Sequence, residues 1–356
     1  MIGRLLNTLN IRQYRDLVEK SDGKIPKSLF RQYAEVIKAR ICGFTAEDYY
    51  VLGLYHGKNW NKMGSIRYNR VNRFLNKRVT GTIEFNKWIF VNYMKMLQIP
   101  VPDTYGFFHP NNGIFADLSD FKTRAHLFDF LHRRSSSFVV KPVNGGKGRN
   151  VVVIDKIIPE KQILIRANQQ TLSFDDFYDL LASHDITWLF QEKVIQTREY
   201  ALFNPSSVNT IRLNTIITDD HDFIVLSGVF RMGTINSEID NLSSGGIAAL
   251  INTQNGILHD ARTTYSQHTF AFHPDSGIPI SGFALPRWDE VRVASIKAHR
   301  ALPFARYLGW DIAVTDSGPV FLEMNSFGAV NFYEKYDVMN YMNLDIGKIY
   351  LNSVEK

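Results

Sequence analysis

Two runs of β-branched residues, joined by a glycine-rich link, constrain the fold of this 356-residue chain more than any other feature. The runs cover residues 137–142 and 149–155, and the link contains Gly145, Gly146 and Gly148. β-Branched residues favour strands, and a short glycine-rich connection between two such runs indicates a β-hairpin. The centre of the chain is therefore expected to contain an antiparallel pair of strands.

The residues before the hairpin follow a helical pattern. Apolar side chains recur three and four positions apart in residues 28–41 and 46–54, as they do in amphipathic helices. A further helix is expected over residues 84–97, and the prolines at positions 100 and 102 forbid its continuation. The opening part of the chain is therefore expected to be helical.

Strands dominate the chain after the hairpin. We expect them at residues 187–193, 208–218, 223–232, 246–252, 311–314 and 320–323, with helices at 174–183, at 288–302 and in the C-terminal tail. A helical region followed by strand-rich regions predicts an α+β protein. We place its boundaries at 1–118 for the helical N-terminal region, 119–194 for a small α+β unit and 195–356 for a larger sheet-based unit.

The charge of the chain narrows the class of partner. Lys and Arg number 41 against 35 Asp and Glu, which gives a net charge of +6 and an isoelectric point of about 9.2. This excess fits an anionic partner such as a nucleotide, an acidic glycan or a lipid surface. Many basic residues lie in the first 80 positions at helical spacing, which is typical of a solvated helix face. Nucleic-acid binding is the alternative, and neither a zinc-finger nor an RNP-type signature supports it.

The cysteine content and the hydropathy of the sequence indicate the cellular compartment in which we expect the protein. Cys42 is the single cysteine, so an intramolecular disulfide is excluded and a reducing compartment is favoured. No stretch approaches the roughly 20 apolar residues of a membrane-spanning helix. We therefore expect a soluble, cytoplasmic protein, with a peripheral membrane contact left open.

The hairpin carries the first candidate site. Lys141 lies at the end of its first strand, and Gly145, Gly146, Lys147 and Gly148 follow. Backbone N–H groups of glycines can approach phosphate oxygens closely, and a lysine adds a positive charge. The loop is not a Walker A motif, because no helix with Ser or Thr follows a Gly-Lys pair. A phosphate-covering loop is one interpretation, and a plain turn is the other.

A second candidate site lies where a later strand ends. Gln191, Glu192, Lys193 and Val194 end that strand, and Glu199 follows. Backbone groups at a strand end can bind the edge of an adenine, and a nearby carboxylate can accept hydrogen bonds from ribose hydroxyls. The alternative is a pair of solvent-exposed glutamates.

Oxygen ligands are concentrated near the C-terminal end of the sheet region. Asp311 and Glu323 belong to two short strands joined by a turn, and the alternation of a strand directs Glu323 and Asn325 to one face. Such ligands suit Mg²⁺. Glu323 lies in an apolar run, where an unpaired carboxylate is costly, so a metal or substrate role competes with that of a merely solvated acid.

Two arginines lie on neighbouring predicted strands. Arg212 and Arg231 can project into a cleft and neutralise phosphate. Exposed strand positions are the alternative.

Taken together and in this order, these residues resemble the ATP-grasp superfamily. The closest likeness is the branch of sugar-transfer-associated ATP-grasp proteins, near the α-L-glutamate-ligase-like proteins, and it covers about residues 86–331. Segments 208–215, 243–252 and 309–314 resemble that branch in particular. The resemblance implies an ATP-grasp fold, in which two α+β subdomains clasp ATP. The small lid subdomain would be 119–194 and the large subdomain 195–356.

The resemblance also assigns roles to residues. It implies that two lysines bracket the triphosphate, that a glycine loop covers it, that a hinge strand holds adenine and that an acid binds ribose. The implied ATP site consists of Lys87, Lys141, Gly145, Gly146, Lys147, Gly148, Gln191, Glu192, Lys193, Val194 and Glu199. The implied Mg²⁺ site consists of Asp311, Glu323 and Asn325.

The sequence departs from the D-alanine ligases at one position. Those enzymes carry an arginine two residues before the first metal-binding acid, where it stabilises the intermediates, and this chain has Gly309 there. We hypothesise that Arg212 supplies the missing charge, with Arg231 as the second choice.

The chemistry implied by the resemblance is amide formation. ATP with Mg²⁺ would convert a carboxylate into an acyl-phosphate, and an amine would displace the phosphate. The substrates suggested by the family are a uronic acid with an amino acid or amino sugar, in surface polysaccharide (capsule or O-antigen) assembly. Phosphorylation of a hydroxyl and a non-catalytic nucleotide-binding module are the alternatives. The sequence does not identify the oligomeric state.

Overall fold

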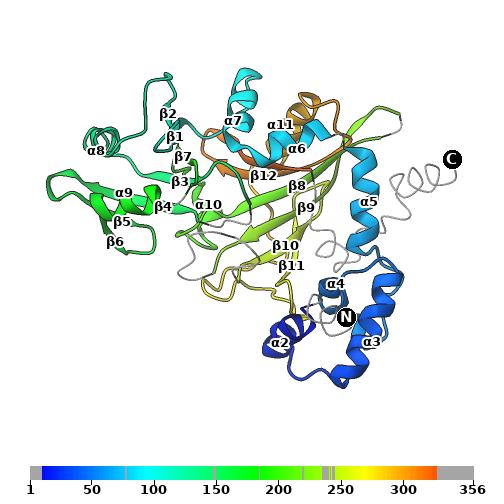
Figure 1. Ribbon diagram of the computed structural model, residues 1–356. Helices are drawn as coiled ribbons and strands as arrows, with labels where there is room; N and C mark the ends of the chain where they lie inside the picture. Colours follow the sequence, from blue (N-terminus) through cyan, green and yellow to red (C-terminus); the bar gives the residue numbers. More distant parts are fainter. Residues whose placement is uncertain are drawn as a thin grey trace.

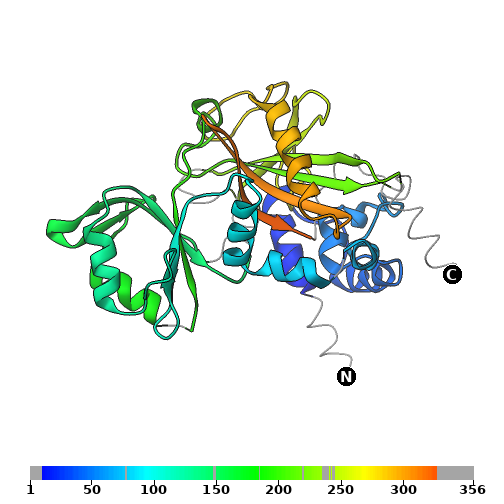
Figure 2. The same ribbon diagram turned by 90° about the horizontal axis from the view of Figure 1, so that it is seen from above.

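The computed structural model describes residues 10–326, apart from 77, 147–149, 184, 219, 235–239, 241 and 243–244. Two antiparallel sheets and a group of N-terminal helices make up this part of the chain (Figure 1). The first sheet forms a lobe of its own, and the second sheet lies between that lobe and the N-terminal helices (Figures 1 and 2).

The N-terminal helices are short and closely packed. They are α2 (Ile11–Asp22), α3 (Leu29–Ile41), α4 (Ala46–Val51) and the 3₁₀ turn η1 (Leu54–His56). Ser28 and Thr45 accept hydrogen bonds from backbone N–H groups in the first turns of α3 and α4, which is how such residues start helices. Tyr49 and Tyr50 are fully buried at the centre of the group, so the group has an apolar core of its own.

Three further helices lead into the first sheet. They are α5 (Ser65–Leu75), α6 (Arg78–Phe85) and α7 (Lys87–Met96). The single helix predicted over 84–97 is wrong in one respect, because the helix is interrupted at Asn86, between α6 and α7. The Asn86 side chain accepts a hydrogen bond from Ile89 N at 3.0 Å and so caps α7. The break places Lys87 at the first position of a new helix.

The first sheet contains seven strands in the order β2-β1-β7-β3-β4-β5-β6. Their bounds are β1 (Thr104–Phe108), β2 (Ile114–Phe115), β3 (Phe138–Pro142), β4 (Val152–Ile158), β5 (Ile163–Arg166), β6 (Thr171–Ser173) and β7 (Trp188–Glu192). The predicted hairpin is confirmed, since β3 and β4 pair antiparallel. Helices α8 (Arg124–His132) and α9 (Phe174–Ala182) pack on the sheet through a phenylalanine-rich core that includes Phe130, Phe138, Phe177 and Phe190.

The second sheet contains six strands in the order β11-β10-β9-β8-β12-β13. They are β8 (Thr210–Ile217), β9 (Phe223–Met232), β10 (Ile247–Ile251), β11 (Leu258–Arg262), β12 (Tyr307–Thr315) and β13 (Gly318–Asn325). The helices of this region are α10 (Arg198–Ala201) and α11 (Trp288–Arg300). All neighbouring strands of the sheet run antiparallel.

The two faces of the second sheet have different partners. Leu213, Phe230 and Trp310 point to one face and share an apolar core with residues of α7 and α11. Tyr307 points to the other face and packs with Tyr68 of α5 in a second core. Successive residues of a strand face opposite sides, so helix α5 covers part of the face to which Arg212 and Asn214 point.

The predicted α+β fold class is confirmed by these two sheets with their helices. The boundaries 1–118, 119–194 and 195–356 stay predictions, and β1 and β2, which precede 119, belong to the first sheet. The helix predicted in the C-terminal tail lies outside the described residues. Among the described helices, none is both long and apolar enough to cross a membrane.

The core between the second sheet and helices α7 and α11 predicts one stability result. Leu213 is fully buried there, so Leu213→Ala leaves a cavity and is expected to lower the free energy of unfolding by about 2–5 kcal/mol. Leu202→Ala makes the same change at a side chain that is 44% exposed and serves as the control. Urea unfolding followed by fluorescence measures both, and equal losses would contradict this assignment of the core.

Candidate active site

The register of the second sheet builds a row of charged side chains. Arg212 of β8 lies opposite Asp311 of β12, and Asp311 lies opposite Glu323 of β13. Directly opposed residues of paired strands point to the same face of a sheet. The row therefore brings together two predicted metal ligands and a predicted catalytic arginine that lies 99 positions before Asp311.

A second row lies next to the first. Gly309 stands between Asn214 of β8 and Asn325 of β13. A Cβ atom at Gly309 would lie 3.0 Å from Asn214 Oδ1 and 3.7 Å from Arg212 Cδ. A longer side chain at this position would meet both residues, so the glycine leaves this part of the face to Arg212.

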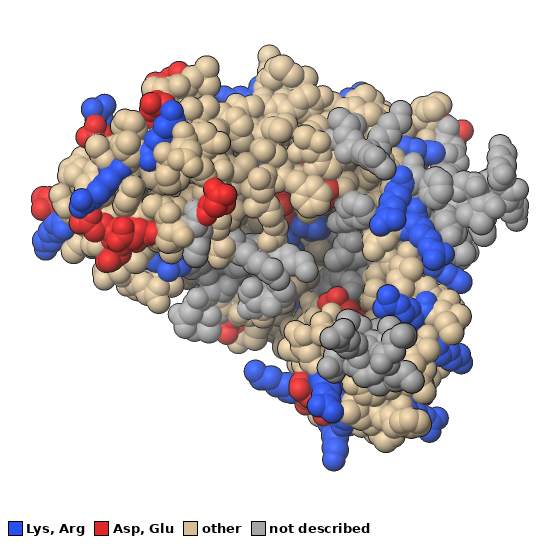
Figure 3. Space-filling model, viewed as in Figure 1, with Lys and Arg blue, Asp and Glu red and all other residues tan. Residues whose placement is uncertain are grey.

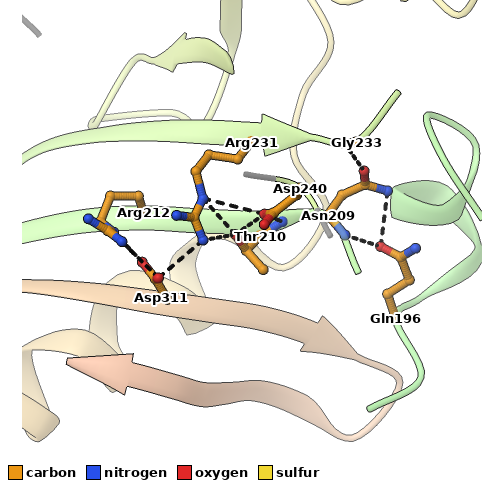
Figure 4. Close-up of polar contacts among 8 residues, drawn as sticks. All are labelled: Gln196, Asn209, Thr210, Arg212, Arg231, Gly233, Asp240 and Asp311. Atoms are coloured by element: carbon orange, nitrogen blue, oxygen red, sulfur yellow. Dashed lines mark hydrogen bonds and ion pairs between the residues drawn. The ribbon is translucent and has the colours of Figure 1, made fainter. Parts of the chain in front are cut away.

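Asp311 is the most heavily paired acid of this face (Figure 4). Arg212 donates to both of its carboxylate oxygens, with 2.8 Å between Nη2 and Oδ2, and Arg231 Nη2 lies 3.1 Å from Oδ2. Burial alone would raise the pKa of Asp311, but Arg212 and Arg231 outweigh it and hold that pKa below the ordinary value. Asp311 is thus a buried carboxylate that stays ionised.

Arg231 is positioned by a residue that the sequence did not single out. Its Nε lies 3.4 Å from Asp240 Oδ2, and its guanidinium donates to Thr210 Oγ1 at 3.0 and 2.6 Å. Asp240 in turn accepts hydrogen bonds from the backbone and hydroxyl of Thr210 (Figure 4). Asp240 lies outside the strands, so no alternating pattern or motif spacing predicted a role for it. Its contact with Arg231 is apparent only from the fold.

Glu323 faces two lysines that come from outside its own sheet. Lys87 Nζ lies 4.0 Å from Glu323 Oε1. Burial and the charge of Asp311 raise the pKa of Glu323, against the opposing charges of Lys87, Lys141 and Arg212. Burial, with the charge of Lys87, lowers the pKa of Lys141 to about 8. The two lysines and the two acids therefore share one electrostatic environment.

Lys87 links the helix α7 to the glycine-rich loop. Its backbone N–H donates to Val143 O at 2.9 Å, and its ammonium donates to Gly145 O at 2.5 Å. Lys141 lies on β3, two residues before Val143. The two lysines predicted to bracket the triphosphate thus come from the start of α7 and from β3.

The glycine-rich loop is open at its described residues. Gly145 has a φ of +115°, a conformation that L-residues rarely adopt, and a Cβ atom at Gly145 or Gly146 would meet no atom within 4 Å. Lys147 and Gly148, the other two predicted loop residues, lie outside the described residues.

The predicted adenine-binding residues lie at the end of β7. Gln191 is buried and donates to Thr104 Oγ1 at 2.9 Å, and Glu192 accepts from Asp103 N at 2.9 Å. Lys193 Nζ lies 2.5 Å from Asp155 Oδ1. In the described part of the chain, no hydrogen bond occupies the N–H of the buried Val194, so a donor is available where the strand ends.

Glu199, the predicted ribose ligand, lies on α10 with an exposed side chain. Helix α10 is attached to the second sheet by a hydrogen bond of 2.9 Å from Thr197 N to Val314 O. Glu199 is therefore carried by the second sheet, whereas Gln191 and Glu192 belong to the first.

The residues predicted to hold Mg²⁺ offer both carboxylate and amide groups on this face. Asn325 Nδ2 and Asn214 Oδ1 are buried, and neither has a hydrogen-bond partner among the described residues. Each carboxylate oxygen of Asp311 has a lone pair beyond those that face the arginines. The described residues contain no cluster of three or more His, Cys, Asp or Glu. Two carboxylates with one amide nevertheless fit a cation that takes its other ligands from phosphate and water.

Acidic and basic side chains meet in a recess between the first-sheet lobe and the N-terminal helices (Figure 3).

A model of the family described as sugar-transfer associated ATP-grasp matches residues 67–337, well over half of the chain. The chain belongs to the sugar-transfer-associated ATP-grasp family. The resemblance found in the sequence is confirmed, and so is the ATP-grasp fold.

Solved structures with low sequence identity also resemble this ATP-grasp chain. The VanG D-Ala:D-Ser ligase from Enterococcus faecalis is 12% identical with a TM-score of 0.46, over 76% of this chain and 61% of that one. The D-alanine–D-alanine ligase from Bacillus anthracis is 15% identical with a TM-score of 0.39, over 76% and 67%. An N5-carboxyaminoimidazole ribonucleotide synthetase in its ADP complex is 11% identical with a TM-score of 0.40, over 69% and 46%.

The ATP-grasp chain thus spans about half to two thirds of the length of these proteins. No curated protein matches its sequence.

The family match begins earlier than the resemblance seen in the sequence, and it adds α5 and α6 to the ATP-grasp region. Both helices reach the end of β13. Asn72 and Asn76 donate to Ser326 O, and Ser326 Oγ donates to Glu84 Oε2. Burial and the charge of Glu323 raise the pKa of Glu84, although hydrogen bonds from Ser326 oppose this. No local pattern marked these residues, because their partner, Ser326, lies more than 240 positions away in the sequence.

The raised pKa of Glu323 predicts a pH-dependent effect of its substitution. An acid with a raised pKa costs stability as pH rises above its unfolded value, here the ordinary 4.5. Glu323→Gln removes that cost and is expected to raise the Tm by about 2 °C at pH 7, with the difference vanishing near pH 4. Thermal unfolding without nucleotide measures it.

Glu160→Gln, at an exposed glutamate, is the control and should leave the Tm unchanged at both pH values. A Tm difference for Glu323→Gln that is negative at pH 7, or equal at pH 7 and pH 4, would contradict the assignment.

Proposed function

We propose that this protein is an ATP- and Mg²⁺-dependent ligase that joins a carboxylate to an amine through an acyl-phosphate. The observation that carries the proposal is one cluster of buried charges. Arg212, Arg231, Asp311 and Glu323 lie on one face of the second sheet, and Lys87 approaches them from outside that sheet. Family membership supports ATP as the nucleotide.

The proposed roles of the lysines follow from their positions. Lys87 and Lys141 bind the triphosphate, and the loop that contains Gly145 and Gly146 covers it. Coverage matters, because water that reached an acyl-phosphate would hydrolyse it. Burial holds the pKa of Lys141 to about 8 in the free protein, and a bound polyanion would stabilise its charged form.

We propose Asp311, Glu323 and Asn325 as the residues that hold Mg²⁺. When bound, the ion neutralises charge on the phosphate oxygens. The raised pKa of Glu323 supports this assignment, because a buried carboxylate gains from a cation beside it.

Arg212 and Arg231 are proposed to stabilise the negative charge that develops during the two steps. In the first step a carboxylate oxygen attacks the terminal phosphorus of ATP, and ADP leaves. In the second step the amine nitrogen attacks the acyl carbon, phosphate leaves and the nitrogen loses a proton. Guanidinium groups fixed by Asp311 and Asp240 need little reorganisation in either step.

The nucleoside part of ATP is assigned to the junction of the two sheets. We propose that the backbone at Gln191 to Val194 binds adenine and that Glu199 binds ribose. The available N–H of Val194 supports the first assignment. The exposure of Glu199 on α10 leaves its carboxylate accessible for the second.

A cavity of about 710 Å³ on the second sheet is proposed to bind a substrate. Arg262, in its lining, lies opposite Ala248, which lies opposite Arg231. Ser227, also in the lining, accepts a hydrogen bond of 2.9 Å from Asn214. The cavity thus adjoins the charged rows on the same face of the sheet.

The lining of this cavity favours a polar substrate. A register shift in β11 leaves His259 and Asp260 between the paired residues Leu258 and Ala261, and both line the cavity. Hydroxyl, amide, carboxylate and guanidinium groups can hydrogen-bond a polyhydroxylated molecule from several sides. With the sugar-transfer description of the family, this supports a uronic acid and an amino acid or amino sugar as substrates, in surface polysaccharide assembly.

The experiment that tests the proposal measures phosphate release from ATP and Mg²⁺. A panel of uronic acids is crossed with amino acids and amino sugars, and products are identified by mass spectrometry. The expected result is phosphate release that requires both partners, with a product whose mass is their sum minus water.

Two outcomes would overturn the ligase. A single hydroxyl-bearing substrate that gains the mass of a phosphoryl group would make the protein a kinase. ATP binding without turnover of any pair, together with an unchanged affinity in Glu323→Gln, would favour a non-catalytic nucleotide-binding module.

Arg212 carries a second prediction. Arg212→Ala removes a guanidinium that would stabilise the transition state, and kcat is expected to fall by about 10²–10³-fold. ATP affinity should change little, and Asp311 keeps Arg231 as its partner, so the fold should persist. Arg292→Ala, at a partly exposed arginine of α11 paired with Asp289, is the control. An Arg212→Ala protein that binds ATP and turns over normally would contradict the role.

A further inference from the structure

Helix α3 exposes an apolar stripe. Phe30 and Ile41 are 85% and 84% exposed, Ile37 is 48% exposed, and Ala34 between them is exposed as well. The four positions are spaced by four, three and four residues, so they form one line along the helix. The opposite side of α3, with Gln32, Val36 and Ala39, is buried against α2 and α4. The stripe is therefore a surface feature of an otherwise anchored helix.

Positive charges flank this stripe. Arg31, Lys38 and Arg40 are exposed on α3. The single acid of the helix, Glu35, pairs with Lys27 at 2.7 Å and with Arg31 at 3.3 Å, and it accepts a hydrogen bond from Tyr49 Oη at 2.6 Å. In the part of the chain that the structure describes, no carboxylate forms an ion pair with Lys38 or Arg40.

Neighbouring helices extend the basic surface. Arg12, Lys20 and Lys24 are exposed on α2 or just after it, and Arg67, Arg70 and Arg73 are exposed on α5. In the space-filling view, lysines and arginines gather over the lobe of the N-terminal helices and on α5 (Figure 3). The charge is thus spread over a surface larger than one helix.

We propose that α3 docks this protein on an anionic lipid surface. The stripe enters the boundary between headgroups and acyl chains, and the flanking arginines and lysines meet the anionic headgroups. Eleven residues separate Phe30 from Ile41, which corresponds to about 16 Å along a helix.

The shape of the surface favours lipid over a protein partner. The stripe lies on the convex side of a single helix, whereas a protein partner would need a groove complementary to it. A lipid boundary adapts to the helix and offers both anionic and apolar groups within one layer. No described helix is long and apolar enough to cross a membrane, and the proposed contact is made through one face of α3.

The test is co-sedimentation of the full chain with vesicles. Vesicles of phosphatidylcholine are compared with vesicles of phosphatidylcholine and phosphatidylglycerol at low and high salt. The wild type is expected to bind the anionic vesicles and to be released by salt. The double variant F30S/I41S is expected to lose at least 10-fold in apparent affinity, and K38S/R40S to lose the preference for anionic vesicles.

The matched control is Val293→Ser, which removes a side chain that is 70% exposed on α11, and it should bind as the wild type does. Circular dichroism and thermal unfolding establish that each variant is folded. Equal vesicle binding by the wild type and F30S/I41S would overturn the proposal. So would the absence of binding, or a dimer in light scattering that F30S/I41S converts to a monomer without lipid, because the stripe would then be covered by a second copy.

Discussion

The architecture of the candidate site depends on how one buried carboxylate is balanced. Asp311 is 5% exposed, and Arg212 and Arg231 both pair with it. Removing a carboxylate from water costs several kcal/mol unless partners replace the lost hydration. Those partners, Arg212 and Arg231, come from β8 and β9. The buried charge of Asp311 is therefore balanced only when β8 and β9 lie beside β12 in this strand order. Asp240 is a second acid in this cluster, because Arg231, one of the two partners of Asp311, also pairs with it.

The first sheet is tied to this charge balance by two lysines. Lys141 is part of β3, whereas Lys87 begins α7 directly after the break at Asn86. The backbone of Lys87 is bonded to Val143, and its ammonium lies near Glu323. A site that uses groups from both sheets is consequently sensitive to their relative position. This geometry suits an extended ligand with several negative charges, such as a nucleoside triphosphate.

Much of the arrangement could be predicted from local pattern. The hairpin of β3 and β4 follows from two β-branched runs around glycines, and the opposition of Asp311 and Glu323 follows from a short turn between strands. Asp240 and Glu84 could not be found in this way. Their importance arises from partners that only the fold brings close, and neither lies in a motif whose spacing has a physical meaning on its own. The break at Asn86 does have a local signal, because asparagine is a favoured N-cap and caps α7 here; its bridge to Asn144, in contrast, is a tertiary contact.

In the free protein, the carbonyl of Gly145 occupies the ammonium of Lys87 and would therefore compete with an anionic ligand for it. The ammonium that would meet a phosphate already holds a carbonyl of the glycine-rich loop at 2.5 Å. An ammonium has three N–H donors, so an anion that binds Lys87 either shares the ammonium with Gly145 or displaces the Gly145 carbonyl. In the second case the affinity for the anion includes the free-energy cost of breaking the bond between Lys87 and Gly145.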